Sequence, residues 1–144
     1  MNVKDQDLGT LLARAPQLCI LGLSPDPSKP SHSVPLFMRE KGWEIHGVYP
    51  KIHAVHDFTI STTLAEVPSA KRKFLTVFRA SAKIPDLVTE ILDLGGVEVL
   101  WLQLGIAHSE AEAQAERAGL KVISNRCLLI EQQRWNCHPQ KGKS

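Results

Sequence analysis

The sequence predicts an α/β protein of the Rossmann-like type, a three-layer sandwich with an open parallel sheet of five strands between layers of helices. Short apolar runs alternate with amphipathic stretches through the middle of the chain, and glycines or prolines separate them. Strands and helices that alternate in this way pair in parallel through right-handed crossovers. With the strands numbered in chain order, the expected sheet order is 3-2-1-4-5.

The first expected strand, Leu18–Leu23, is an uninterrupted apolar run, which is typical of a strand buried on both faces. The loop 24–31 follows, and its prolines exclude a helix there. Apolar residues at helical spacing then predict a helix over Ser31–Lys41. Ser31 or Ser33 is the expected N-cap, because serine side chains accept hydrogen bonds from free N–H groups at helix starts.

The remaining elements follow from the same periodicities. In chain order we expect a strand at 43–49, a loop at 51–62, a helical turn at 63–67 capped by Thr63, a strand at 74–78, a helix at 84–94, a strand at 97–102, a helix at 109–118 capped by Ser109, and a short strand at 122–123.

Length and composition indicate one globular domain over residues 1–144, with a core from about residue 16 to 135 and a polar tail at 136–144. The net charge of +2 lacks the excess of a general nucleic-acid binder. No apolar run approaches the roughly 18 residues of a membrane span. Three cysteines without a CxxC pair fit a reducing compartment. With charges interrupting any signal peptide in residues 1–17, these features predict a cytoplasmic protein.

Ligands of open parallel sheets bind beyond the carboxyl ends of the strands, at the switch point, which is expected here between the first and fourth strands. The loops at that edge are 22–31, 48–51, 78–81 and 102–108. The first of them leads into a helix N-terminus, where free N–H groups and the helix dipole favour a phosphate. The same loop could equally be a proline-stiffened surface loop with capping serines.

We call the loop 22–31 the phosphate loop. It lacks both the GxGxxG pattern of dinucleotide-binding proteins and the P-loop pattern. Lys51 stands where NAD-binding proteins place an acidic residue, so it suits a phosphate-bearing ribose, as in CoA or NADP, or is simply solvated. Arg79 could supply a second cation or pair with Asp86 or Glu90. Gln103 could bind an amide or a phosphate.

We expect no metal site and no catalytic residues. The six histidines form no metal-binding constellation. His32, beside the phosphate loop, is a weak candidate for acid–base chemistry, and Cys127 is a weak candidate nucleophile. The chain is therefore expected not to be an enzyme.

Five motifs together resemble the small YccU-like CoA-binding proteins. They are Gly22-Leu23-Ser24 with Pro30-Ser31-His32-Ser33-Val34, Val48-Tyr49-Pro50-Lys51, Val77-Phe78-Arg79, Trp101–Ile106 and Asn125–Glu131. That family shares its fold with the CoA-binding domain of the succinyl-CoA synthetase α subunit, whose phosphohistidine lies in a second domain.

The resemblance implies a cofactor, CoA or an acyl-CoA, lying across the sheet edge. The residues implied as contacts are Gly22, Ser24, Lys29, Pro30, Ser31, Val48, Pro50, Lys51, Phe78, Arg79, Leu102 and Gln103. Lys51 would face the 3′-phosphate. The chain departs from the family at Tyr49, which replaces the usual Asn, at Thr76, which replaces the usual Asp, and in the short segment 52–62.

Two other functions remain open from the sequence. One is an NAD(P)-binding oxidoreductase or redox-sensing domain, and the other is an interaction module that has kept the fold and lost its ligand. Expected partners are a small nucleotide ligand and, as a possibility, a second copy of the chain or another protein. Neither nucleic acid nor membrane is expected.

Overall fold

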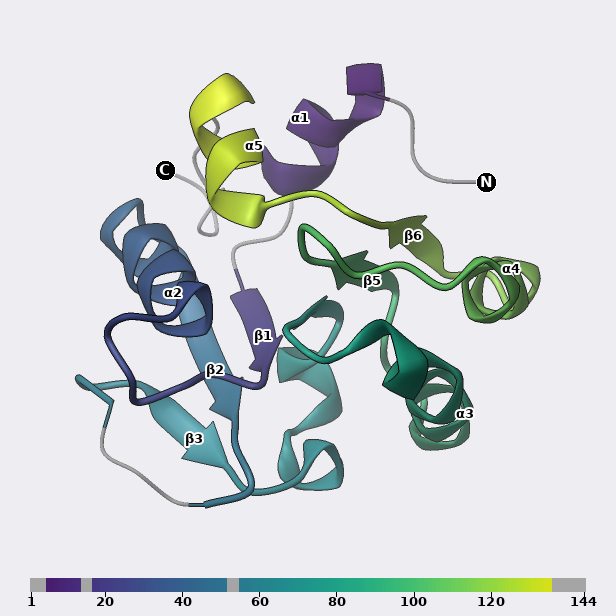
Figure 1. The fold of residues 1–144 in the computed structure, drawn as a ribbon, viewed down its shortest axis with the longest axis horizontal. Coiled ribbons are helices and arrows are strands. Elements are labelled where there is room, and N and C mark those ends of the chain that lie inside the picture. Colours follow the sequence, from purple (N-terminus) through teal and green to yellow (C-terminus); the bar gives the residue numbers. More distant parts are fainter. Residues whose placement is uncertain (1–4, 14–16, 52–54, 136–144) are drawn as a thin grey trace.

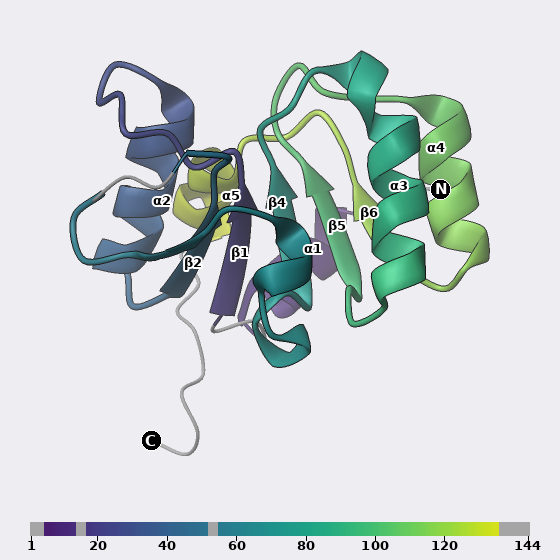
Figure 2. The same ribbon diagram turned by 90° about the horizontal axis from the view of Figure 1, so that it is seen from below.

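The structure is a computed structural model that describes residues 5–13, 17–51 and 55–135. A parallel sheet runs through the centre and helices cover both faces (Figure 1, Figure 2). The strands are β1 (Gln17–Leu21), β2 (Glu44–Val48), β3 (Thr59–Ser61), β4 (Phe74–Val77), β5 (Val99–Leu102) and β6 (Lys121–Ile123). The α-helices are α1 (Asp5–Ala13), α2 (Pro30–Glu40), α3 (Ile84–Leu94), α4 (Ser109–Arg117) and α5 (Leu128–Trp135).

The Rossmann-like class and the parallel sheet are confirmed, but the sheet has six strands rather than five, in the order β3-β2-β1-β4-β5-β6. The expected loop 51–62 contains the additional strand β3, which pairs with β2 from His46↔Thr59 to Val48↔Ser61. Phe74–Val77, expected beyond the second strand, instead pairs with β1. The switch point therefore lies between β1 and β4 rather than beside Val99–Leu102.

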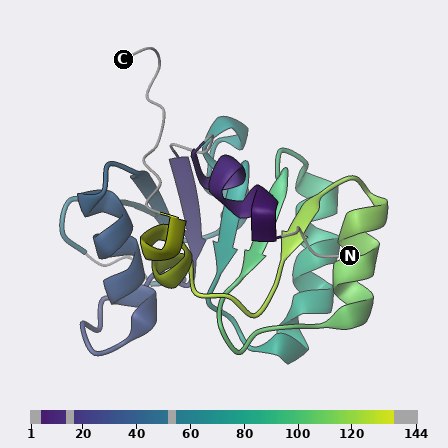
Figure 3. The same cartoon turned by 90° about the horizontal axis from the view of Figure 1, so that it is seen from above.

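Alternate residues of β1 face opposite layers, as the pleat of a strand requires. Cys19 and Leu21 belong to a core with α3 and α4, whereas Leu18 and Ile20 belong to a core with α1, α2 and α5. Figure 3 shows α1 and α5 together on the second face, and the two helices contact each other. Both cores are apolar, so the sheet is buried on its two sides.

Two helices were not expected from the sequence. The segment that forms α1 contains Gly9 and Thr10, which are poor helix formers. Among the residues of this helix whose burial is described, 7–13, Leu8 and Leu12 are buried, one turn apart. The helix α5 begins at the fully buried Leu128 and is polar over much of its length. Tertiary packing rather than local pattern stabilises both helices.

The helix caps differ from expectation at two of three positions. Lys29 is the N-cap of α2, without a side-chain hydrogen bond, so neither Ser31 nor Ser33 caps this helix. His108, rather than Ser109, caps α4, and its Nδ1 accepts a hydrogen bond from the Ala111 N–H at 3.3 Å. The expected cap at Thr63 is confirmed as a capping box with Glu66. Within the described part of the chain, no helix is long and apolar enough to cross a membrane.

Candidate functional site

A groove of about 940 Å³ opens at the carboxyl edge of the sheet, where β1, β2 and β4 end. Eight of the twelve residues predicted as contacts line it, namely Gly22, Ser24, Lys29, Ser31, Val48, Pro50, Phe78 and Arg79. The structure thus brings together residues from three separate segments of the chain. The volume of the groove falls in the range typical of small-molecule sites.

Gly22 forms the floor of the groove at the end of β1. Its N–H donates to the Val48 carbonyl at 2.8 Å, and the neighbouring Leu21 carbonyl accepts from the Phe78 N–H at 2.9 Å. Its φ is +95°, and a Cβ at this position would lie 2.6 Å from the Phe78 carbonyl oxygen. Only glycine fits this conformation and this close approach of two backbones.

The loop that follows Gly22 is held by its own hydrogen bonds. The Ser24 N–H donates to the Ser31 carbonyl at 3.2 Å, and Ser24 Oγ accepts from the Asp26 N–H at 3.0 Å. The Asp26 carboxylate accepts from the N–H and the hydroxyl of Ser28, and these bonds lower the pKa of Asp26. The loop is therefore preorganised around the start of α2, and Ser24 orders the loop instead of projecting freely into the groove.

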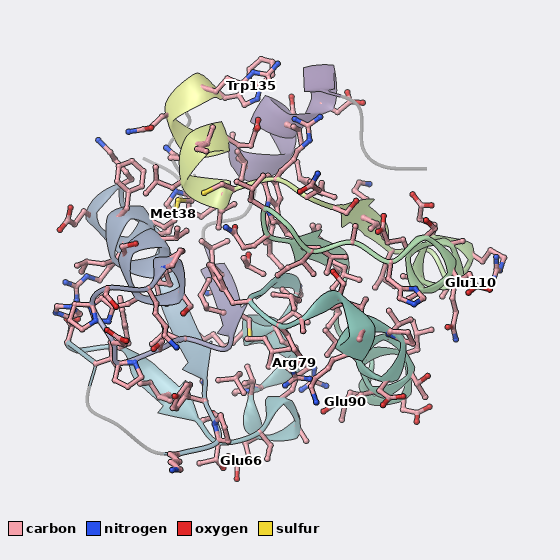
Figure 4. All side chains as sticks on the ribbon, viewed as in Figure 1. Met38, Glu66, Arg79, Glu90, Glu110 and Trp135 are labelled. Atoms are coloured by element: carbon pink, nitrogen blue, oxygen red, sulfur yellow. The ribbon has the colours of Figure 1, made fainter. Side chains whose placement is uncertain are left out.

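The cations of the groove come from two elements. Lys29 lies at the start of α2, and Arg79 and Lys83 follow β4. Asp86 and Glu90, one helical turn apart on α3, line the same groove as Arg79. Figure 4 labels the side chains of Arg79 and Glu90. Among the described residues Arg79 forms no ion pair within 4.0 Å, so its guanidinium is available to a ligand.

Four predicted contact residues do not line the groove. Pro30 is the first residue of α2, which fits proline because the first helical N–H has no partner within the helix. Lys51 is exposed beyond the end of β2. Leu102 is fully buried in the core between the sheet, α3 and α4.

Gln103 is the fourth of these residues; it is buried, and its side chain has a structural partner. Its Oε1 accepts a hydrogen bond from the N–H of Leu128 at 2.8 Å, at the start of α5. An amide oxygen in this position satisfies one of the free donors of a helix N-terminus. The side chain thus joins the end of β5 to the last helix.

Several groove residues were not identified from the sequence. Tyr49, Lys83, Thr62 and Thr63 were not predicted as contacts, and Asp86 and Glu90 were considered only as ion partners of Arg79. Thr62 and Thr63 donate to the Glu66 carboxylate, and hydrogen bonds from Thr62 lower the pKa of Glu66 most. The capping-box pattern at Thr63 is the signal in the sequence that points to the part of the groove lined by Thr62 and Thr63.

Two observations concern the reactive side chains in the described part of the chain. Burial raises the pKa of Cys19 to about 12, so this thiol is inert. Within the described residues no three histidine, cysteine, aspartate or glutamate side chains gather to hold a metal ion. The geometry offers backbone, hydroxyl and cationic groups, which are the groups that bind an anionic ligand.

Known proteins resemble this chain in sequence and in structure. It is 28% identical over 129 residues to the uncharacterized protein YneT of Bacillus subtilis strain 168, covering 90% of this chain and 94% of that protein. A solved protein from Thermus thermophilus superposes with a TM-score of 0.84 at 32% identity, over 92% of this chain and 99% of the other. A hypothetical protein from Pyrococcus horikoshii OT3 gives 0.82 at 25% identity, over 93% of each chain.

A family model describes most of the chain. The model of the CoA binding domain matches residues 17–133, from the start of β1 into α5. The match includes every residue of the groove at the carboxyl edge. The chain therefore belongs to the CoA binding domain family.

Proposed function

We propose that this protein binds CoA, or an acyl-CoA, in the groove at the carboxyl edge of β1, β2 and β4 and performs no chemistry on it. The observation that carries the proposal is the convergence on one groove of eight of the contact residues that the family resemblance implies. Membership of the CoA binding domain family supports the ligand class. The absence of an acidic residue after β2, where Tyr49-Pro50-Lys51 stand, favours a phosphate-bearing ribose over NAD.

The pyrophosphate fits at the start of α2. This helix has no side-chain N-cap. Pro30 has no N–H, and the N–H groups of His32 and Ser33 donate to the Lys29 carbonyl, so the Ser31 N–H and the helix dipole are left to interact with an anion. Lys29, before α2, and Arg79, after β4, line the same groove. Charge-assisted hydrogen bonds to phosphate are about twice as strong as neutral ones. Backbone and cations together therefore provide most of the affinity.

Titration calorimetry with CoA, acetyl-CoA, NAD, NADP and ATP tests the ligand class. CoA and acetyl-CoA should bind and NAD should not. A ligand at 100 times its dissociation constant adds about 2.7 kcal/mol to the free energy of unfolding, which a thermal melt detects readily. Tight binding of NAD with no binding of CoA would show that the oxidoreductase or sensor alternative is right.

A matched pair of variants tests the site. Arg79→Ala removes a cation from the groove, whereas Arg117→Ala removes one from the exposed last turn of α4. We expect Arg79→Ala to weaken CoA binding by roughly tenfold or more, the scale of one charged hydrogen bond, and Arg117→Ala to leave it unchanged. Equal affinities in both variants would place CoA elsewhere.

The lack of chemistry has its own test. Purified protein incubated with acyl-CoAs should release no free thiol above the rate in buffer. Release that is lost in Cys127→Ala would show instead that the partly buried Cys127 acts as a nucleophile.

A further inference from the structure

A second cavity adjoins the phosphate loop and differs from the proposed CoA groove in its charge. It measures about 710 Å³ and is lined by Pro25 and Pro27 of the loop, by one face of α2, and by Val55 and His56. Its ionisable lining residues are His32, His56 and Glu40, and none of its described lining residues is a lysine or an arginine. Cations that suit phosphates thus line one groove, and imidazoles line the other.

The two histidines face each other through their Nε2 atoms. These atoms lie 3.2 Å apart, and the ring centroids are 5.1 Å apart. His32 is buried at the start of α2, whereas His56 is exposed and has a left-handed backbone with φ of 51°. A non-glycine residue in that conformation is strained, and such strain is common at functional sites.

The other nitrogen of His32 is fixed by the loop. Its Nδ1 lies 2.9 Å from the Ser24 carbonyl oxygen, and a carbonyl only accepts, so Nδ1 carries the proton. In the neutral ring, Nε2 therefore presents its lone pair toward His56. Histidines that bind metals almost always donate their other ring N–H to a carbonyl or carboxylate in this way.

We propose that His32 and His56 form a two-histidine binding site for a divalent transition-metal ion of the zinc type, outside the CoA groove. Zinc–nitrogen bonds of about 2.0–2.1 Å at a tetrahedral angle place two nitrogens about 3.3 Å apart, close to the observed separation. Imidazole suits zinc, copper and nickel. Water fills the other positions, because the cavity is open to solvent beside His56.

One carboxylate, that of Glu40, lines the cavity together with the two imidazoles. In the metal-free pair, the His56 Nε2–H donates to His32 Nε2. To bind a metal through Nε2, His56 must carry its proton on Nδ1 instead. Both rings stay neutral, so metal binding changes the tautomer of His56 and releases no proton.

Calorimetric titration of the full chain with zinc chloride, in a buffer without chelators and without CoA, tests the site independently of the proposed function. The variants are His56→Asn, since asparagine tolerates a left-handed backbone, and His32→Gln. His46→Gln is the control, because the His46 ring contacts Ser61 Oγ at 2.8 Å and lies outside this cavity. Thermal melts establish that each variant is folded.

We expect one saturable site per chain in the wild type and in His46→Gln, weakened by at least about tenfold in His56→Asn and in His32→Gln. Zinc should also raise the melting temperature of the wild type and not that of His56→Asn. Absence of saturable binding to the wild type would mean that the two imidazoles form only a hydrogen bond. Undiminished binding in the folded His56→Asn variant would place the ion elsewhere. Either result overturns the proposal.

Discussion

Gln103 tests whether this residue has a structural or a ligand-binding role, because the sequence predicts that it contacts the ligand. The structure instead directs its Oε1 to the N–H of Leu128, at 2.8 Å. Both residues are buried, so water has little access to the donor if the acceptor is removed. Gln103→Leu keeps a side chain of similar size and leaves the Leu128 N–H without its partner.

An unsatisfied buried donor costs about 1–3 kcal/mol. For a domain near this size each kcal/mol lowers the melting temperature by roughly 2–4 °C. We therefore expect Gln103→Leu to melt about 2–12 °C below the wild type. Urea denaturation should show the same loss in the free energy of unfolding.

The same change at an exposed position is the control. Gln133 is exposed on α5, so Gln133→Leu should alter stability by less than about 0.5 kcal/mol. CoA affinity, measured well below the melting temperature, should be unchanged in Gln103→Leu. An unaltered melting temperature together with a tenfold loss of CoA affinity would refute the structural role and restore the predicted contact.

Three further predictions follow from single residues. Gly22→Ala should destabilise the protein by roughly 2 kcal/mol or more in urea denaturation, since the strained φ and the Phe78 carbonyl both oppose a Cβ; wild-type stability would contradict this. Dephospho-CoA should bind the wild type roughly two- to fivefold more weakly than CoA, the scale of one exposed ion pair. Lys51→Ala should abolish that difference, and an unchanged difference would exclude Lys51. Cys19 should resist iodoacetamide in the folded protein. Its contribution to the free energy of unfolding should fall as pH rises from 9.0 towards about 12, because the thiol loses its proton at lower pH in the unfolded chain than in the folded one. A Cys19→Ala variant whose free energy of unfolding depends on alkaline pH in the same way as that of the wild type would contradict this.

The central strands were predictable because their signal is strong and local. Runs such as Val99–Leu102 and Phe74–Val77, apolar except for Thr76, have few alternatives to a buried strand. The strand β3 was not predicted from the sequence, because it has three residues, lies at the sheet edge and is only partly buried. Without it, the place beside β2 was assigned to Phe74–Val77. Apolar pattern identifies a strand but carries no information on its neighbour.

The site was predictable to the extent that topology determines it. Parallel strands end at one edge, so Gly22, Val48 and Phe78 had to meet wherever their strands were adjacent. Side-chain direction was not predictable in the same way. The amide of Gln103 lies at the correct edge and turns toward α5, a helix that the sequence did not reveal. The cap of α4 was similarly assigned to Ser109, although the His108 ring also accepts from free N–H groups.

Amide chemical shifts recorded by NMR during a titration with CoA test the central claim most directly. Saturating CoA should shift the backbone amides of Gly22, Ser24, Ser31 and Arg79, which line the groove, and leave those of β6 and α4 near their original positions. The amide chemical shifts of His32 and His56 should change less than those of the groove residues. Absence of shifts at saturating CoA, or shifts centred on α4 and β6 with the groove unchanged, would contradict the proposed site.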